Sequence, residues 1–327
     1  MDKEFLYDML RTPSVSGHEI ALQKKVIQHM ESVSDEILTD ATGDVISVLN
    51  PHAEAKVLLC GHIDEIGFLV TRICEDGMLK VTKAGGIHPV LYLGTHVQVV
   101  CASQILPGVV VTNRTLESKE QVQVEDLFID LGFDSKAECE RYVSIGDPVC
   151  AASEFTELAH GKLAGRALDD RIGAFIILEA LKKAKQKQAA CGMYAATTCG
   201  EETTMRGAYH VATRVQPSCA LIVDVTFASD YPGVSGDASG TVKLGGGAVL
   251  CSNSMINKPL NAALAAIAEE HQLDVQWEVF AGKAGTDGDV VHLQTVACRL
   301  PLFPSRCVIC IPPLKRQAIR IWKRSLN

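Results

Sequence analysis

The sequence has no long apolar run, no surplus of basic residues and no low-complexity segment. Its apolar runs, such as those at 57–60 and 175–178, fall far short of the roughly 20 residues that cross a bilayer, so we expect no membrane partner. Lys and Arg number 31 against 39 Asp and Glu, which gives a net charge of -8. No basic stripe is therefore available to neutralise phosphates, and we expect no nucleic-acid partner.

The sequence also lacks the marks of export. The first ten residues contain acids and no apolar core ahead of a small-residue cleavage site, so we expect no signal peptide. The 12 cysteines show no repeating spacing, which in a chain without an export signal favours reduced thiols. The expected location is the cytoplasm.

Helical and strand-like spacings alternate along most of the chain. Strands are predicted at 44–49, 56–60, 192–198, 220–225 and 273–279, and helices at 168–185, 207–213 and 257–271. Ser16 and Glu19 have the spacing of a capping box ahead of a further helix. This alternation predicts an α/β fold, with a mostly parallel sheet flanked by helices on both faces.

The pattern changes between residues 68 and 163. Short β-rich pieces lie there among glycines and prolines, with one short helix near 135–142. We therefore expect a small β-rich domain at 68–163, inserted into a catalytic α/β domain that is formed by 1–67 and 164–294.

Four segments place acids directly after an apolar strand or at the start of a helix. They contain His62 and Asp64, Asp169 and Asp170, Glu201 and Glu202, and Asp224. Residues two apart in a strand share a face, so His62 and Asp64 are expected to project together past the strand end. Ligand sites of open α/β sheets collect at the carboxyl ends of strands, and three of the four segments deliver their acids to that edge.

Such a group of acids is more stable around a cation. Carboxylates gathered without one repel each other and raise each other's pKa. One histidine with several acids suits zinc, manganese or cobalt, and a pair of such ions activates a water held between them. Taken singly, each segment has an ordinary interpretation, such as a capped turn, a helix start or a solvated acid pair. Their joint occurrence in this order predicts a metal site.

The segments GHIDEIGF, ALDDRIG, EETTMRGA and DVTFASDYPG resemble, in this order, the motifs of the glutamyl/deblocking aminopeptidases that form tetrahedral particles. That family belongs to the dinuclear zinc exopeptidases. The resemblance runs from the first helix to about Gln294 and includes SIGDPV in the inserted domain. It implies a zinc-exopeptidase-like fold, a peptide substrate, two divalent metal ions (zinc or cobalt), and assembly through the insert into homo-oligomers, from dimers to dodecamers.

The resemblance also implies which residues hold the metals. His62 is expected to bind one ion, and Asp169 is expected to bridge both. Asp170 follows Asp169 across a peptide bond that is often cis in these enzymes, and stands behind the ligands. Glu202 and Asp224 are each expected to bind one ion.

The remaining implied roles concern catalysis and the substrate. Glu201 is expected to be the general base, which deprotonates the bridging water and passes the proton to the leaving amine. Asp64 is expected to orient the imidazole of His62. Thr286 and Asp287, in the segment AGTDGD, match a loop near the substrate pocket.

The sequence departs from the family at Thr204, where a glycine is usual, and more strongly at 295–327. The family continues with a GVPT-like turn, a strand and an RYxHSPxE motif whose histidine is the fifth protein ligand. Here the chain reads TVACRLPLFPSRCVICIPPLKRQAIRIWKRSLN, with four prolines and a basic bias. Because proline interrupts both strands and helices, we interpret 295–327 as an aberrant tail in place of the last strand and helix.

A change of reading frame explains this tail. Codons for residues 302–317 can be written so that the same DNA, read from the third base of each preceding codon, encodes AISVPLRYMHSPVEAA, and residues 295–301 permit NGGVPTA. An unrelated tail would not contain a family motif at the right distance, so we infer a frameshift near Thr295. The histidine codon of that frame straddles Cys310 and Ile311.

The sequence therefore predicts a metal-dependent aminopeptidase that removes N-terminal residues from short peptides through a water bridging two metals. Two alternatives stay open. One is a catalytically dead relative or gene relic that lacks the fifth metal ligand. The other is a glycoside hydrolase, which paired acids such as Glu201 and Asp64 suggest and which needs no transition metal.

Overall fold

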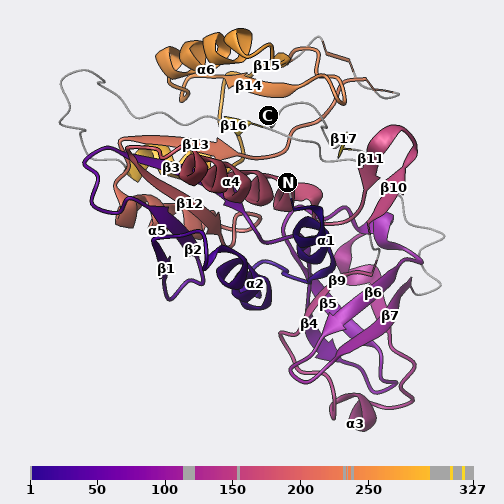
Figure 1. The fold of residues 1–327 in the computed structure, drawn as a ribbon. Coiled ribbons are helices and arrows are strands. Elements are labelled where there is room, and N and C mark those ends of the chain that lie inside the picture. The colour runs from indigo at the N-terminus through magenta and orange to yellow at the C-terminus, as the bar shows by residue number, and fades with distance from the viewer. Residues whose placement is uncertain are drawn as a thin grey trace.

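The computed structural model describes residues 2–112, 122–152, 155–230, 233, 235–236, 239–294, 310–311 and 319–320. Helices lie on both faces of a central sheet, and a small β-barrel projects from one end of this body (Figure 1). The predicted α/β fold with a small β-rich element is confirmed. The predicted aberrant tail, 295–327, lies outside the described residues except for two short strands, so it stays a prediction.

The central sheet has six strands in the order β1-β2-β12-β3-β13-β16. They are β1 (Glu36–Thr39), β2 (Val45–Leu49), β12 (Gly192–Thr198), β3 (Lys56–His62), β13 (Cys219–Val223) and β16 (Cys310–Ile311). β12, β3, β13 and β16 run parallel to one another, whereas β1 and β2 form an antiparallel edge. The parallel strands all end at one edge of the sheet, and this edge gathers the residues that follow them.

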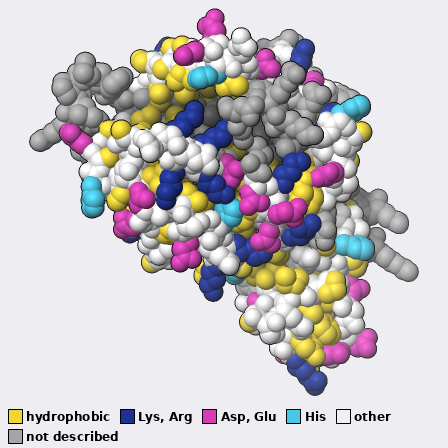
Figure 2. Space-filling model, in the orientation of Figure 1, with side chains coloured by type: hydrophobic (Ala, Val, Ile, Leu, Met, Phe, Trp, Pro, Cys, Tyr) yellow, Lys and Arg dark blue, Asp and Glu magenta, His cyan; other side chains and the backbone are white. Residues whose placement is uncertain are grey.

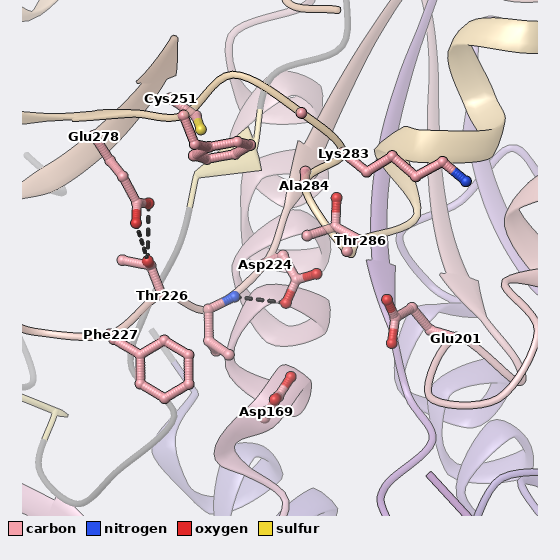
Figure 3. Close-up of a pocket in the computed structure, with 14 residues that line it drawn as sticks. Asp169, Glu201, Asp224, Thr226, Phe227, Cys251, Glu278, Lys283, Ala284 and Thr286 are labelled. Carbon is pink, nitrogen blue, oxygen red and sulfur yellow. Dashed lines mark hydrogen bonds between the residues drawn. The ribbon is translucent and has the colours of Figure 1, made fainter. Parts of the chain in front are cut away.

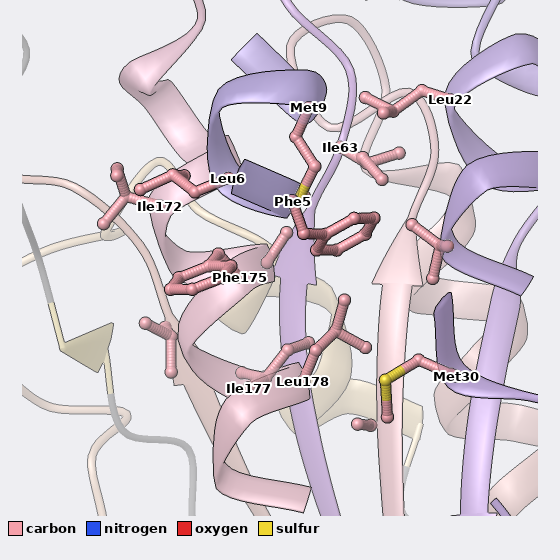
Figure 4. Packing of buried hydrophobic residues seen from close by; sticks show 14 of the residues in the cluster. Phe5, Leu6, Met9, Leu22, Met30, Ile63, Ile172, Phe175, Ile177 and Leu178 are labelled. Carbon is pink, nitrogen blue, oxygen red and sulfur yellow. The ribbon is translucent and has the colours of Figure 1, made fainter. Parts of the chain in front are cut away.

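Apolar layers hold helices against both faces of this sheet. One face is covered by α1 (Lys3–Arg11), α2 (Ile20–Met30) and α4 (Leu168–Gln186), and the other by α5 (Arg206–Val215) and α7 (Gly288–Gln294). On the first face, Phe5, Met9, Leu22, Phe175 and Leu178 belong to one buried cluster (Figure 4). Burying a side chain of this size contributes roughly 1.5–3 kcal/mol. Cover on both faces explains why the strands are continuous apolar runs.

A separate layer lies above the main sheet. It consists of the parallel strands β14 (Ala248–Ser252) and β15 (Val275–Val279), with α6 (Lys258–Glu270) between them in the chain. The sequence predicted a single sheet that includes 273–279, and this prediction is wrong for the described residues. β16 lies between β13 and β14 (Figure 1), and among the described strands it is hydrogen-bonded to β13 alone. A strand of two residues is too short to join the two sheets.

The β-barrel occupies the predicted insertion. Its strands are β4 (Gly67–Ile73), β5 (Leu79–Ala84), β6 (His96–Val100), β7 (Ile105–Thr112), β8 (Leu127–Asp130) and β9 (Pro148–Ala151), closed in the order β4-β5-β8-β7-β6-β9. Phe68, Val97 and Leu127 belong to the apolar cluster that fills it. The helix predicted near 135–142 is shorter, α3 (Lys136–Cys139). The outer limits of the inserted domain, 68–163, stay a prediction.

Buried ion pairs fasten the barrel to the body. The chain enters the barrel just after Glu65, and Nη1 of Arg166, beyond the barrel, lies 2.6 Å from both carboxylate oxygens of Glu65. The buried Arg171 donates to the same carboxylate and to Ser14 Oγ. Burial raises the pKa of Glu65, but the charges of Arg171 and Arg166 outweigh it and hold this pKa below its ordinary value. The two chain segments that join the barrel to the body are therefore held together at Glu65.

The remaining elements are short. A small antiparallel sheet, close in the chain to Arg166, consists of β10 (Thr156–Leu158), β11 (Lys162–Ala164) and β17 (Ile319–Arg320). The 3-10 helices are η1 (Pro89–Tyr92), η3 (Val124–Asp126) and η4 (Ala159–Gly161). Among the described helices, none combines the length and the apolar character that crossing a membrane requires.

Candidate metal centre

The first segment ends β3. His62 is the last residue of this strand and is 2% exposed, and Asp64 is fully buried. Nδ1 of His62 lies 3.4 Å from Asp64 Oδ1, while Nε2 lies 3.1 Å from Asp169 Oδ1. The two carboxylate oxygens of Asp64 accept hydrogen bonds from the backbone N–H groups of Glu201 and Glu202. Asp64 therefore holds the imidazole and the Glu201–Glu202 turn together.

The second segment opens α4. The peptide bond between Asp169 and Asp170 is cis, the form that the resemblance implied. Oδ1 of the buried Asp170 accepts a hydrogen bond from Gly173 N at 3.0 Å, and its Oδ2 has no hydrogen-bond partner among the described residues. A Cβ atom at position 173 would lie 2.3 Å from the Asp170 carboxylate, so glycine is required there. Asp169 faces the adjoining pocket, and Asp170 lies buried behind it.

The third segment follows β12. This strand pairs with β3 so that Thr198 lies opposite His62, which brings the Glu201–Glu202 turn to the same edge. Oε2 of Glu201 lies 3.8 Å from His62 Nε2. Positive φ values occur at Gly200 and Met205 and not at Thr204. The threonine that replaces the usual glycine therefore needs no left-handed conformation.

The fourth segment follows β13 and completes the cluster. Oδ1 of Asp224 lies 3.9 Å from His62 Nε2. Ligand atoms of His62, Glu201 and Glu202 lie within 4.8 Å of one another, as do those of His62, Asp170 and Asp224. The structure thus brings all residues of the four predicted segments together. Asp170, which the resemblance placed behind the ligands, is close enough to be a ligand itself.

The electrostatics of the cluster fit a divalent cation. Burial raises the pKa of Glu201 to about 9 and the pKa of Asp224 to about 8. Burial and then the charge of Asp224 raise the pKa of Asp170. Burial lowers the pKa of His62, but hydrogen bonds with Asp169 and Asp64 reverse this and raise it well above its ordinary value. A bound cation favours charged carboxylates and a neutral imidazole, so metal binding would displace these protons.

A pocket of about 260 Å³ opens beside the cluster (Figure 3). Asp169, Glu201 and Asp224 line one part of it. Thr226 and Glu278 line another part, where Thr226 Oγ1 lies 2.9 and 2.8 Å from the two carboxylate oxygens of Glu278. The cluster and this cavity are therefore continuous.

The two residues of the predicted substrate loop are placed differently. Thr286 lines the pocket. Asp287 lies deeper, where its Oδ2 accepts a hydrogen bond from Thr198 Oγ1 at 2.5 Å and lies 3.5 Å from Cys60 Sγ. Burial raises the pKa of Asp287 to about 6. Asp287 thus supports the ends of β12 and β3 from behind.

Thr226 and Glu278 are among the pocket residues that were not predicted from the sequence. Thr226 lies two residues after Asp224, a spacing that places two side chains on one side of an extended segment and so gave a usable signal. Glu278 lies in β15, which the chain reaches only after α6. No local pattern marks Glu278, because only the packing of β15 beside β14 brings it to the pocket.

Comparisons with known proteins agree with this geometry. Residues 43–301 match the model of the M42 glutamyl aminopeptidase family. The lysyl aminopeptidase of Pyrococcus furiosus is 28% identical over 304 residues, which cover 90% of this chain and 85% of that protein.

Two solved structures are similar over almost the whole chain. The TET aminopeptidase of the marine sediment archaeon Thaumarchaeota archaeon SCGC AB-539-E09 is 28% identical with a TM-score of 0.86, covering 97% of this chain and 90% of that one. The TET1 peptidase of Pyrococcus horikoshii, which can assemble into a tetrahedron or a large octahedral shell, is 28% identical with a TM-score of 0.81, covering 97% and 94%. Because the family match extends over most of the sequence, the chain belongs to the M42 glutamyl aminopeptidase family.

Proposed function

We propose that this chain is a metal-dependent aminopeptidase that removes the N-terminal residue from short peptides. The observation that carries the proposal is the meeting of one histidine and several carboxylates, from four separate segments, beside a pocket. A pocket of about 260 Å³ admits the end of a peptide and excludes a folded protein.

The metals, two divalent ions such as zinc or cobalt, would be held by His62, Asp169, Glu202 and Asp224. Nε2 would be the ligand atom of His62, because Nδ1 faces Asp64, which would fix the tautomer. Asp169 would contribute to holding both ions, because it lies against His62 and also lines the pocket. When bound, such ions supply an activated water and polarise the peptide carbonyl.

Glu201 is assigned the proton transfer. It lines the pocket, and Asp64 holds its backbone N–H at 3.0 Å. Burial raises the pKa of Glu201, so its carboxyl holds a proton in the absence of metal. A bound cation would displace that proton and leave a carboxylate that can take a proton from the attacking water. The same carboxyl group then returns the proton to the leaving amine. Asp64 acts through His62 and Glu201 by fixing their positions.

The barrel is proposed to mediate assembly into homo-oligomers, from dimers to dodecamers. Its surface exposes apolar side chains, including Val90, Leu91, Ile105 and Ile145. Apolar side chains gather over the barrel in the space-filling view (Figure 2). Exposed apolar surface of this kind marks interaction sites. We place the assembled enzyme in the cytoplasm, with the catalytic domain at 1–67 and 164–294 and the assembly domain at 68–163.

The frameshift explains what the cluster lacks. β16 pairs Ile311 with Val223, the residue directly before Asp224. In the second reading frame a histidine falls at Cys310 and Ile311, so it would come to the metal centre beside Asp224. The chain with that frame from about Thr295 onward is called the restored chain. As written, the chain lacks this fifth ligand, and the alternative function is that of a dead relative or gene relic.

A linear peptide and a cyclic peptide of the same composition test the proposed activity. We expect the metal-loaded chain to shorten the linear peptide one residue at a time from its N-terminus, and a chelator to abolish this. Mass spectrometry of the products gives the direction of cleavage.

The cyclic peptide is the control, because it has no N-terminal amine and should stay intact. Its cleavage at the same rate would contradict the proposal. Cello-oligosaccharides test the glycosidase alternative, since their hydrolysis in the presence of chelator would favour two-carboxylate chemistry. Peptide cleavage by the restored chain alone would support the relic alternative.

A further inference from the structure

The pocket contains a carboxylate that the proposed chemistry does not use. Glu278 is half-buried, and both of its carboxylate oxygens lie within hydrogen-bond distance of Thr226 Oγ1. Burial raises the pKa of Glu278 and the bond from Thr226 lowers it, with no contribution from a cation. Among the described residues, no Lys, Arg or His forms an ion pair with Glu278. A partly desolvated acid without a positive partner is a site for one.

We propose that Glu278 selects peptides whose N-terminal residue is cationic, lysine or arginine. The inference rests on the proposed function, because it takes the cluster as the place of the reacting peptide bond. The first side chain of the substrate then has to occupy the rest of the pocket, where Glu278 and Thr226 lie.

The dimensions of the pocket suit a long side chain. Thr226 lies two residues after Asp224, and two residues of extended chain span at most about 7 Å. The four-carbon stem of a lysine bridges such a distance. Cys251 and Phe280 line the same pocket and provide apolar surface for the stem. The charged end would meet the Glu278 carboxylate, which Thr226 holds in place.

Lys283 also lines the pocket and would favour the opposite class, an acidic N-terminal residue. Its side chain is exposed, and in Figure 3 its ammonium group points away from Glu278 and Thr226. Exposed ion pairs contribute little, whereas charge pairs that lose water on binding contribute more. An acidic side chain would in addition be repelled by Glu278. The half-buried carboxylate therefore decides the preference.

Two measurements on the metal-loaded full chain test the inference. Calorimetry with L-lysine, L-leucine and L-glutamate measures product binding, and kcat/KM for tripeptides that begin with each residue measures turnover. We expect lysine to be preferred over leucine and glutamate to be the poorest. Glu278→Gln keeps the shape and removes the charge, and should lower the preference for lysine over leucine about tenfold or more.

Two further variants sharpen the result. Thr226→Val removes the hydroxyl that holds Glu278 and should lower the same preference by a smaller factor. Glu270→Gln, an exposed acid at the end of α6, is the matched control and should leave it unchanged.

The outcomes separate this inference from the proposed function. A preference for leucine or glutamate that Glu278→Gln leaves unchanged overturns the inference, while the aminopeptidase stands. Lysine binding that depends on Glu278 without turnover of any peptide supports the inference and contradicts the proposed activity. A chain that neither binds nor cleaves any of the three overturns both.

Discussion

The restored chain is expected to have a kcat/KM for short peptides at least about 100-fold higher than the chain as written. Loss of a residue that merely supports a metal ligand costs about 10- to 100-fold, so a missing ligand should cost at least the upper figure. The restored strand would also supply backbone partners along β13, which in the described structure pairs with only two tail residues. Peptidase assays and metal analysis on the two proteins, prepared in parallel, check this expectation.

A third protein distinguishes the effect of the added histidine ligand from the effect of the added strand. The restored chain with its new histidine changed to alanine should lose the gain in activity and keep the gain in thermal stability. Equal activity of all three proteins would show that the histidine is not a ligand, and would contradict the proposed fifth position.

Replacing Glu201 with glutamine in the restored chain is expected to lower kcat by about 10²- to 10⁴-fold, the usual contribution of a general acid–base group. Glutamine keeps the shape of the side chain but takes up no proton from water. Because Glu201 is assigned no metal, the metal content should not change. Steady-state kinetics and metal analysis measure the two effects.

The neighbouring Glu202→Gln variant is the matched comparison. Glu202 is assigned as a ligand, so its replacement should lower the metal content together with the activity. Glu270→Gln, at the end of α6 and outside the lining of the pocket, controls for the loss of one acid. Loss of metal from the Glu201→Gln variant would contradict the role assigned to Glu201. Full retention of metal by the Glu202→Gln variant would contradict the assignment of Glu202 as a ligand.

Local pattern was sufficient where an element is determined by its own residues. The run predicted as a strand at 192–198 is β12 (Gly192–Thr198), and the helix predicted at 168–185 is α4 (Leu168–Gln186). Both are long apolar or periodic segments, for which hydrophobic spacing is a strong signal. Parallel strands end at one edge, so the meeting of His62, Glu201 and Asp224 also followed from the sequence.

Distant partners determined the features that the sequence did not predict. The predicted capping box is wrong, because Ser16 Oγ bonds to Thr203 Oγ1 and α2 begins without a side-chain cap. Glu19 instead accepts a hydrogen bond from Gly17 N. Thr203 is distant in the sequence and Gly17 lies in a loop, so the periodicity of the helix could not predict either partner.

The separate position of β14 and β15 has a similar cause. Their sequences are strand-like, but they could join the main sheet only through a strand that pairs with both β13 and β14. In the described part of the chain, only Cys310–Ile311 lies there. The place of Glu278 follows from the same packing, so local sequence carried no signal for it.

Titration of metal-free protein with zinc or cobalt, followed at once by calorimetry and by peptide hydrolysis, tests the central claim most directly. The proposed mechanism predicts no hydrolysis without metal, and a rise in hydrolysis that follows the binding of two ions per restored chain. Full hydrolysis by the metal-free protein, or hydrolysis with no ion bound to the cluster, would contradict it.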